Sequence, residues 1–138
     1  MGVKYEWADD SHLIMNIFLE FPWSWKEYVE LTDELMSVLR DTQHPCATVV
    51  DTTKMGSLAQ DDNPMQNLLH AGNIIPENVF VSVTVGAPNG IPVFINMLKK
   101  VRPQAQRVAI VASTIDEAHQ IILERYQELY PDSSINNG

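Results

Sequence analysis

The chain has 138 residues, of which 45% are hydrophobic and 20% are charged, and its formal net charge is −9. This length and composition suit a single globular domain and exclude a wholly disordered chain. The acidic balance argues against a nucleic-acid binder, which needs clustered positive charge to neutralise phosphates.

Cysteine content and hydrophobic runs indicate the cellular compartment of the protein. Cys46 is the only cysteine, so the chain can form no internal disulfide and suits a reducing compartment. No apolar run approaches the roughly 20 residues of a membrane-spanning helix. The opening residues, MGVKYEWADD, lack the apolar segment of a signal peptide. We therefore expect a cytoplasmic protein with no membrane span.

Charge is distributed unevenly along the chain. Between Asn78 and Ile115 there is no Asp or Glu, and the stretch carries +4 against −13 for the remainder. This pattern is consistent with a local basic patch on an acidic protein. The basic residues of the stretch are Lys99, Lys100, Arg102 and Arg107.

The first predicted elements are two strands. Lys4–Trp7 alternates polar and bulky side chains, and Ala8–Ser11 has the composition of a tight turn. His12–Phe21 is apolar at nearly every position. These features predict a hairpin whose second strand is buried on both faces.

A helix is predicted to follow, beginning at Ser24 and ending before Pro45. Ser24 and Glu27 have the spacing of a capping box. Trp23 and Tyr28 have the spacing of a hydrophobic staple, which leaves the neighbouring Trp25 without an assigned direction. The apolar stripe that would face the core comprises Tyr28, Thr32, Leu35 and Leu39.

The middle of the chain predicts a strand, a loop, a helix and another strand. The first strand covers Ala47–Val50 and ends at Asp51, and a polar loop follows over Thr52–Asn63. A short helix is predicted from Pro64 to about Gly72. Val79–Val85 is the clearest strand, because its valines alternate with other side chains.

The last third predicts a turn, a helix, a strand and a closing helix. Gly86–Gly90 forms the turn, a helix runs over Pro92–Val101, and Arg107–Ala112 is the final strand. Thr114 and Glu117 repeat the capping-box spacing at the start of the closing helix. The apolar face of that helix comprises Ile115, Ala118, Ile122, Tyr126 and Leu129.

This element order predicts the fold class. It reads ββαβαβαβα, and helices that alternate with strands are typical of right-handed crossovers in a mostly parallel sheet. The N-terminal strand should pair antiparallel with its neighbour. We therefore predict a single α/β domain over residues 1–130 and a frayed polar tail over residues 131–138.

Several segments carry a resemblance to a known family. They are the opening strand pair and Pro22-Trp23-Ser24-Trp25, Ala47-Thr48-Val49-Val50-Asp51, Val81-Ser82-Val83-Thr84-Val85-Gly86 and Ile115-Asp116-Glu117-Ala118. From about Tyr5 to Tyr126 the chain resembles STAS domains, the sulfate-transporter and anti-sigma-factor-antagonist type. The resemblance implies a STAS-like fold and a non-enzymatic bacterial regulatory module that binds a partner protein.

The family's phosphorylation switch is altered in this chain. In the antagonists the switch is a Ser or Thr in an Asp-Ser-Ser-Gly-like motif that opens the second helix. The corresponding residues here are Asp51-Thr52-Thr53-Lys54-Met55-Gly56-Ser57-Leu58. Asp51 matches by position, whereas Gly56 and Ser57 are rearranged. Given this departure, the resemblance implies a divergent branch of the family.

Polar residues follow the carboxyl ends of the predicted parallel strands, where α/β sheets bind ligands. We predict that they form a regulatory or ligand-binding rim, and phosphorylation of Ser57 would add charge there. The alternative is that they serve as helix caps and turns. The rim residues are Asp51, Thr52, Thr53, Ser57, Asn89, Ser113 and Thr114.

A second group of residues predicts an interaction surface for a protein partner or a second copy of the chain. It combines aromatic and apolar side chains with lysines, as protein interfaces do. A homodimer is therefore one expectation, with the identity of any other partner left open. The residues are Trp25, Phe94, Met97, Lys99 and Lys100.

The sequence contains no recognisable catalytic, metal or cofactor motif. No serine lies in a Gly-x-Ser-x-Gly elbow, and Gly86–Gly90 lacks the spacing of a nucleotide fingerprint. His44 and Cys46 lack the further ligands that zinc needs, and Cys46 suits a buried strand start. We therefore expect a protein that is not an enzyme and has no cofactor.

Two functional interpretations are preferred, and an enzyme ranks third after them. The first is a STAS-like module that acts by protein–protein interaction. The alternative is a small-molecule or lipid-binding domain of a related α/β fold, with a pocket lined by Asn16, Ser82 and Thr84.

Overall fold

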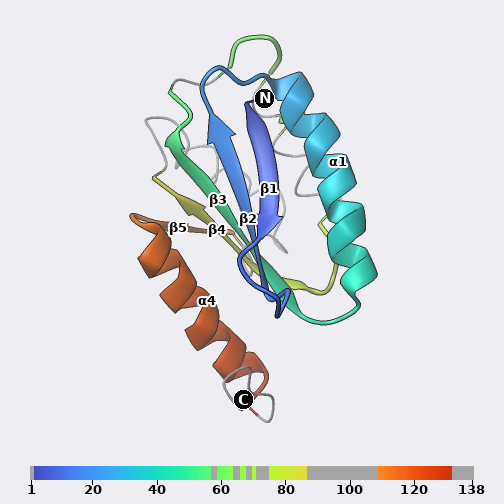
Figure 1. Cartoon of the computed structure of the whole chain (residues 1–138), viewed down its shortest axis with the longest axis vertical. Helices are drawn as coiled ribbons and strands as arrows, with labels where there is room; N and C mark the ends of the chain where they lie inside the picture. The colour runs from blue at the N-terminus through green and yellow to red at the C-terminus, as the bar shows by residue number, and fades with distance from the viewer. Residues whose placement is uncertain are drawn as a thin grey trace.

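The computed structural model describes residues 2–56, 59–63, 66–67, 70, 75–86 and 109–131. Within them, five strands form one mixed sheet in the order β1-β2-β3-β4-β5 (Figure 1). β1 is antiparallel to β2, and all later neighbours are parallel. The α/β class and the antiparallel N-terminal strand are thus confirmed. The strands are β1 (Val3–Trp7), β2 (Ile14–Glu20), β3 (Cys46–Lys54), β4 (Val79–Val85) and β5 (Ala109–Ala112).

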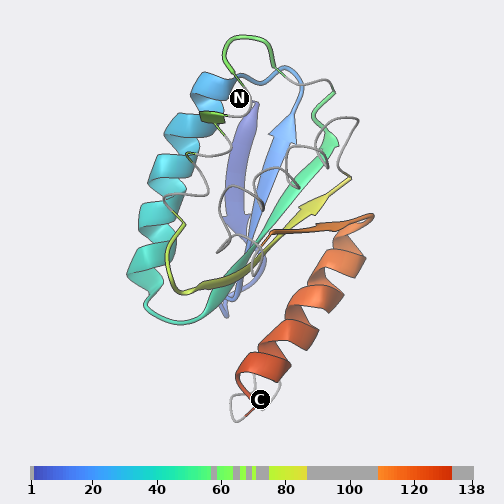
Figure 2. The ribbon, with the colours of Figure 1, turned by 180° about the vertical axis from the view of Figure 1, so that it is seen from behind.

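Two helices lie on opposite sides of the sheet, as Figures 1 and 2 show. They are α1 (Trp25–Thr42) and α4 (Ile115–Leu129). The helix predicted over Pro92–Val101 lies outside the described residues. Of the helix predicted from Pro64, the described residues Gln66, Asn67 and His70 are helical.

The core has two parts because side chains alternate between the two faces of each strand. Under α1, the core contains Met15, Ile17 and Leu19 of β2 together with Leu35 and Leu39 of α1. On the other face, α4 covers a second cluster, which includes Ala47, Val49, Val81, Val83 and Ile122. The sheet therefore has a well-packed centre on both faces.

Strand boundaries agree with the sequence pattern where the pattern is strictly alternating. Val79–Val85 is β4 as predicted. β3 continues past Asp51 to Lys54, because Lys54 pairs with Glu20 and its carbonyl accepts the Phe21 N–H at 2.8 Å. The prediction that the second strand is buried on both faces is wrong for its second half, where Phe18 and Glu20 are only half-buried.

α1 begins as predicted, but only one of the two hydrogen bonds of the predicted capping box forms. The Ser24 hydroxyl accepts the Glu27 N–H at 3.1 Å. The Glu27 carboxylate accepts the Gly2 N–H at 3.0 Å instead of returning to the cap. Asp61, from the distant loop, accepts the N–H groups of Trp25 and Lys26 at 2.9 and 3.2 Å. This carboxylate therefore supplies acceptors for the free donors of the first helical turn.

Asp61 should make stability depend on pH. The Trp25 N–H that it accepts, helped by that of Lys26, lowers the pKa of this carboxyl. Because the pKa of Asp61 is lower in the folded chain, the ionised carboxylate stabilises the fold above about pH 4, the pKa of Asp in an unfolded chain. This stabilisation is lost as the pH falls through the lower pKa of the folded chain. We expect Asp61→Asn to be less stable than the wild type at pH 7, with a smaller deficit near pH 2.5 than at pH 7. Urea unfolding at both pH values measures this, and an equal deficit at both would refute the role of the charge.

α4 also begins as predicted, since the Thr114 hydroxyl accepts the Glu117 N–H at 3.1 Å. Ala118 and Ile122 are fully buried against the sheet. The predicted apolar face extends one residue too far, because Leu129 is 50% exposed at the last turn.

Trp25 is a correction to the predicted interaction surface. Its side chain is only 2% exposed, and its indole N–H donates to the Ala59 carbonyl at 2.8 Å. The ring makes edge contacts with Trp23 and Tyr28, at centroid distances of 4.7 and 5.4 Å. Trp25 thus lies between the two residues of the predicted staple and belongs to the core.

Cys46 is buried at the start of β3, as its position suggested. Burial raises the pKa of its thiol to about 11, so little reactive thiolate forms at neutral pH. We expect iodoacetamide at pH 8 to label Cys46 in urea and to leave it largely unlabelled in the native protein. Mass spectrometry measures the difference, and rapid native labelling would contradict this burial.

Candidate functional site

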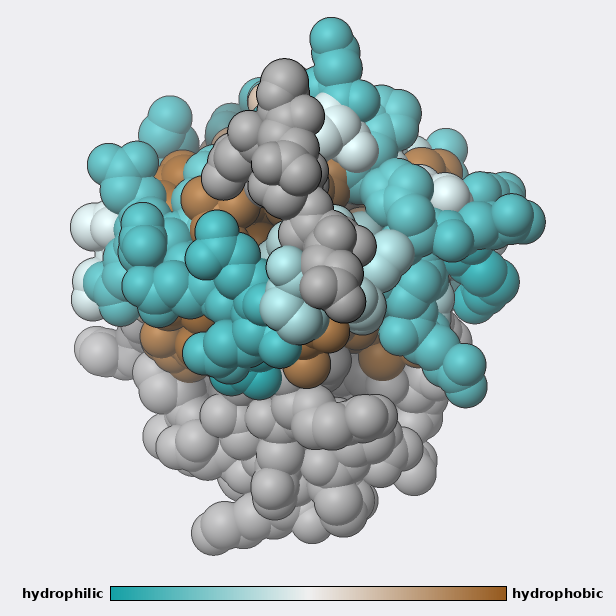
Figure 3. Space-filling view, turned by 90° about the horizontal axis from the view of Figure 1, so that it is seen from below, coloured by the Kyte–Doolittle hydropathy of each residue, from teal (hydrophilic) through white to brown (hydrophobic). Residues whose placement is uncertain are grey.

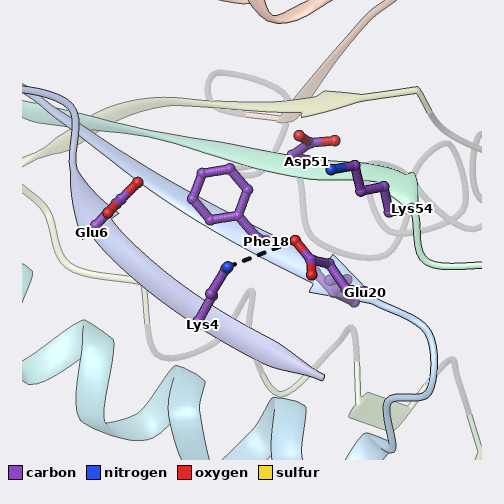
Figure 4. A pocket seen from close by; sticks show the side chains of 7 residues that line it. Lys4, Glu6, Phe18, Glu20, Asp51 and Lys54 are labelled. Atoms are coloured by element: carbon purple, nitrogen blue, oxygen red, sulfur yellow. Dashed lines mark ion pairs between the residues drawn. The ribbon is translucent and has the colours of Figure 1, made fainter. Parts of the chain in front are cut away.

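The face of the sheet that α4 covers is left open toward β1. α4 packs on β3, β4 and β5, and a depression of about 280 Å³ lies over β1, β2 and the end of β3 (Figure 4). We call this surface the open face. It is defined by Lys4, Glu6, Phe18, Glu20, Asp51 and Lys54.

Strand register brings these side chains together. Lys4 pairs with Phe18, which in turn pairs with Asp51, so one row crosses all three strands. Glu20 pairs with Lys54 in the next row. Because paired residues point to the same face, residues that are distant in sequence share one surface. Figure 4 shows Phe18 among the charged side chains.

The charges of the open face are only weakly paired. Lys4 Nζ lies 3.8 Å from Glu20 Oε2 and 5.7 Å from the centre of the Phe18 ring. The Lys4 side chain is 63% exposed, so this pair adds little stability. Among the residues that the structure describes, Glu6 and Lys54 make no ion pair. These charges are therefore available to a ligand or partner.

Three of the predicted rim residues, Thr52, Thr53 and Thr114, make hydrogen bonds within the chain. Thr52 is buried and donates its hydroxyl to the Val85 carbonyl at 2.6 Å. Thr53 donates its N–H and hydroxyl to Asp51 Oδ1 at 2.9 and 2.6 Å. Thr114 caps α4. Thr114 is thus a helix cap, as the alternative interpretation expects, whereas Thr52 links the ends of β3 and β4.

Asp51 is the rim residue that also belongs to the open face. Ser113 is exposed just after β5. Ser57 and Asn89 lie outside the described residues, as do Phe94, Met97, Lys99 and Lys100 of the predicted interaction surface.

Phe21 is an exposed aromatic residue that the sequence prediction did not select. It is 70% exposed and follows Glu20 at the end of β2. Its ring packs beside Gly56, and its N–H is bonded to the Lys54 carbonyl. The sequence signal that could have indicated its exposure is Pro22. Because Pro has no backbone N–H to donate to a sheet, a strand tends to end before it, and Phe21 stands at that end.

The pocket predicted for a small molecule does not form from the residues proposed for it. Asn16 pairs with Val49 on the face of α4. Ser82 and Thr84 pair with Thr48 and Val50, on the face of α1, and the Ser82 hydroxyl accepts that of Thr48 at 2.6 Å. The three side chains are thus on opposite faces of the sheet, which corrects the prediction.

Three features of the described part of the chain bear on its chemistry. Seen from below (Figure 3), the coloured surface is mostly hydrophilic, with hydrophobic residues in small separate areas. Among the described residues, no three His, Cys, Asp or Glu side chains are grouped to hold a metal ion. None of the described helices is long and apolar enough to cross a membrane.

Comparison of the sequence with protein-family models finds no match, and a comparison with curated proteins also finds none.

Proposed function

We propose that the chain is a non-enzymatic, STAS-like regulatory module of the bacterial cytoplasm that binds another polypeptide on its open face. The observation that supports this most is Phe18, half-buried on β2 beside a register shift in the pairing with β3 and surrounded by charges of both signs. Protein interfaces combine an aromatic centre with a polar rim in the same way. Phe21, which is 70% exposed, follows directly after Glu20 in the chain.

The shape of the open face favours a polypeptide over a small molecule. Small-molecule sites enclose most of their ligand and are largely apolar, whereas this depression is open and has charged walls. A partner that fits would place an apolar side chain on Phe18 and a basic side chain near Glu6 or Asp51. An acidic side chain of the partner would face Lys54.

Position-specific photo-crosslinking tests this proposal. We expect p-benzoylphenylalanine at position 18 to capture a polypeptide in cells, and Lys54→Glu to reduce its yield about tenfold, as loss of a charge contact worth ~1.4 kcal/mol would. Lys26→Glu is the matched control, because Lys26 is an exposed residue of α1.

The same label at Val111, which is 41% exposed on β5, controls for non-specific capture. Equal yields at positions 18 and 111, or a yield that Lys54→Glu does not change, would contradict the proposal. A lipid or small molecule retained in native mass spectrometry, with no captured polypeptide, would instead favour the ligand-binding alternative.

A further inference from the structure

β1 is the edge strand of the sheet beside the open face. It pairs with β2 on one side, and no described strand lies on its other side. In Figure 1 the edge of β1 faces the viewer, and no described element passes in front of it. An edge of this kind presents unpaired backbone groups that can bind another strand.

The hydrogen-bond pattern shows which backbone groups face outward. The Gly2 carbonyl accepts the Glu20 N–H at 2.7 Å, and the Ala8 N–H donates to the Ile14 carbonyl at 2.8 Å. Because bonded positions alternate along an antiparallel strand, the backbone groups of Lys4 and Glu6 also point to β2. Those of Val3, Tyr5 and Trp7 then point away from the sheet. The rest of the described chain supplies no hydrogen-bond partner for them.

Tyr5 stands between residues of opposite charge, Lys4 before it and Glu6 after it. We propose that β1 pairs antiparallel with β1 of a second copy of this chain, with Tyr5 opposite Tyr5 of the copy. This register bonds the outward groups of Val3 and Trp7 to each other across the two-fold axis. It also places Lys4 opposite Glu6 of the copy, and Glu6 opposite Lys4 of the copy.

The register is specified by charge as well as by hydrogen bonding. Opposite residues of a non-hydrogen-bonded pair have Cβ atoms about 4.5–5.5 Å apart, which allows each Lys4–Glu6 contact to form an ion pair. Shifting the two-fold axis to Glu6 would place two like charges opposite each other, which is unfavourable. Both side chains are exposed in the single chain, so they can make these contacts without rearrangement of the core.

Self-pairing would also enlarge the candidate site. Lys4 and Glu6 belong to the open face, so the open faces of the two copies would meet along the new seam. This inference goes beyond the proposed function, because it requires no partner other than the chain itself. A single short strand buries less area than a stable interface needs, so the dissociation constant should be on the order of micromolar or weaker.

Charge exchange between two variants tests the proposal on the purified chain. Sedimentation equilibrium of the wild type should show a reversible dimer. Lys4→Glu alone and Glu6→Lys alone place like charges opposite each other, and each should raise the dissociation constant at least tenfold. Mixing the two variants should restore association as a heterodimer, and the double variant Lys4→Glu/Glu6→Lys should restore the homodimer.

The controls separate association from folding. Lys26→Glu should dimerise as the wild type does, and circular dichroism should confirm that every variant remains folded. A wild type that stays monomeric at millimolar concentration would overturn the proposal. A mixture of the two variants that associates no better than either alone would also overturn it. Neither result would bear on the polypeptide captured at position 18, so the two proposals fail separately.

Discussion

Replacing Trp25 with alanine is expected to lower the free energy of unfolding by about 3–5 kcal/mol, the range for large buried aromatic residues. The ring fills the space between Trp23 and Tyr28, where it is 2% exposed. Its removal would leave a cavity in the cluster under α1 and an unpaired carbonyl at Ala59. Urea unfolding followed by circular dichroism measures the change.

Two further variants serve as controls for the loss of the Trp25 ring. Trp25→Phe keeps a ring but loses the N–H to Ala59, so it should cost about 1–3 kcal/mol. Phe21→Ala, at the 70% exposed aromatic residue, should change stability by less than about 0.5 kcal/mol. If Trp25→Ala destabilised no more than Phe21→Ala, the assignment of Trp25 to the core would be wrong.

Replacing Gly86 with alanine is the second change with a large expected effect, about 2–4 kcal/mol of destabilisation. Gly86 has a φ of 72°, which glycine adopts far more readily than alanine. A Cβ at this position would lie 2.5 Å from the Thr53 methyl carbon and 3.3 Å from its Cα. The close approach joins the ends of β3 and β4 at the predicted rim.

A double-mutant cycle separates these two causes. Thr53→Ser removes the methyl group and keeps the hydroxyl that bonds Asp51. In that background we expect Gly86→Ala to cost only about 1–2 kcal/mol, the backbone contribution. Thermal unfolding of the four proteins measures the coupling. An equal cost in both backgrounds would show that the Thr53 methyl is not the obstacle.

Local sequence patterns predicted the elements whose causes are local. Ser24 and Thr114 cap their helices through the residue three positions later, and this bond depends only on spacing. The valines of β4 alternate strictly, and the strand has the predicted bounds. In each case the residues that decide the structure are neighbours along the chain.

Tertiary contacts explain what the sequence did not predict. Asp61 completes the start of α1 from 36 residues away, and no local pattern indicates this bond. β3 is longer than expected because Lys54 pairs with Glu20 of β2. Trp25 is buried by a loop residue, Ala59, that its helical spacing could not reveal.

The candidate site also depends on tertiary contacts. The open face exists because α4 packs on β3, β4 and β5, and no described helix packs on Lys4, Glu6, Phe18 and Glu20 of β1 and β2. The hairpin was predicted, whereas the extent of its cover depends on where α4 packs, a helix that begins 95 residues after the end of β2. The exposed edge of β1 likewise follows from strand order, which the alternation of Lys4 and Glu6 does not specify.

The central claim about the edge of the sheet is that two copies of this chain pair along β1, beside the open face. Hydrogen exchange resolved to single amides, in dilute and in concentrated solutions of the purified chain, tests it most directly. We predict that the amides of Tyr5 and Trp7 exchange more slowly at high concentration, while those of Lys4 and Glu6, already bonded to β2, do not change. Concentration-independent exchange at Tyr5 and Trp7, or new protection confined to α4 or β5, would contradict the claim.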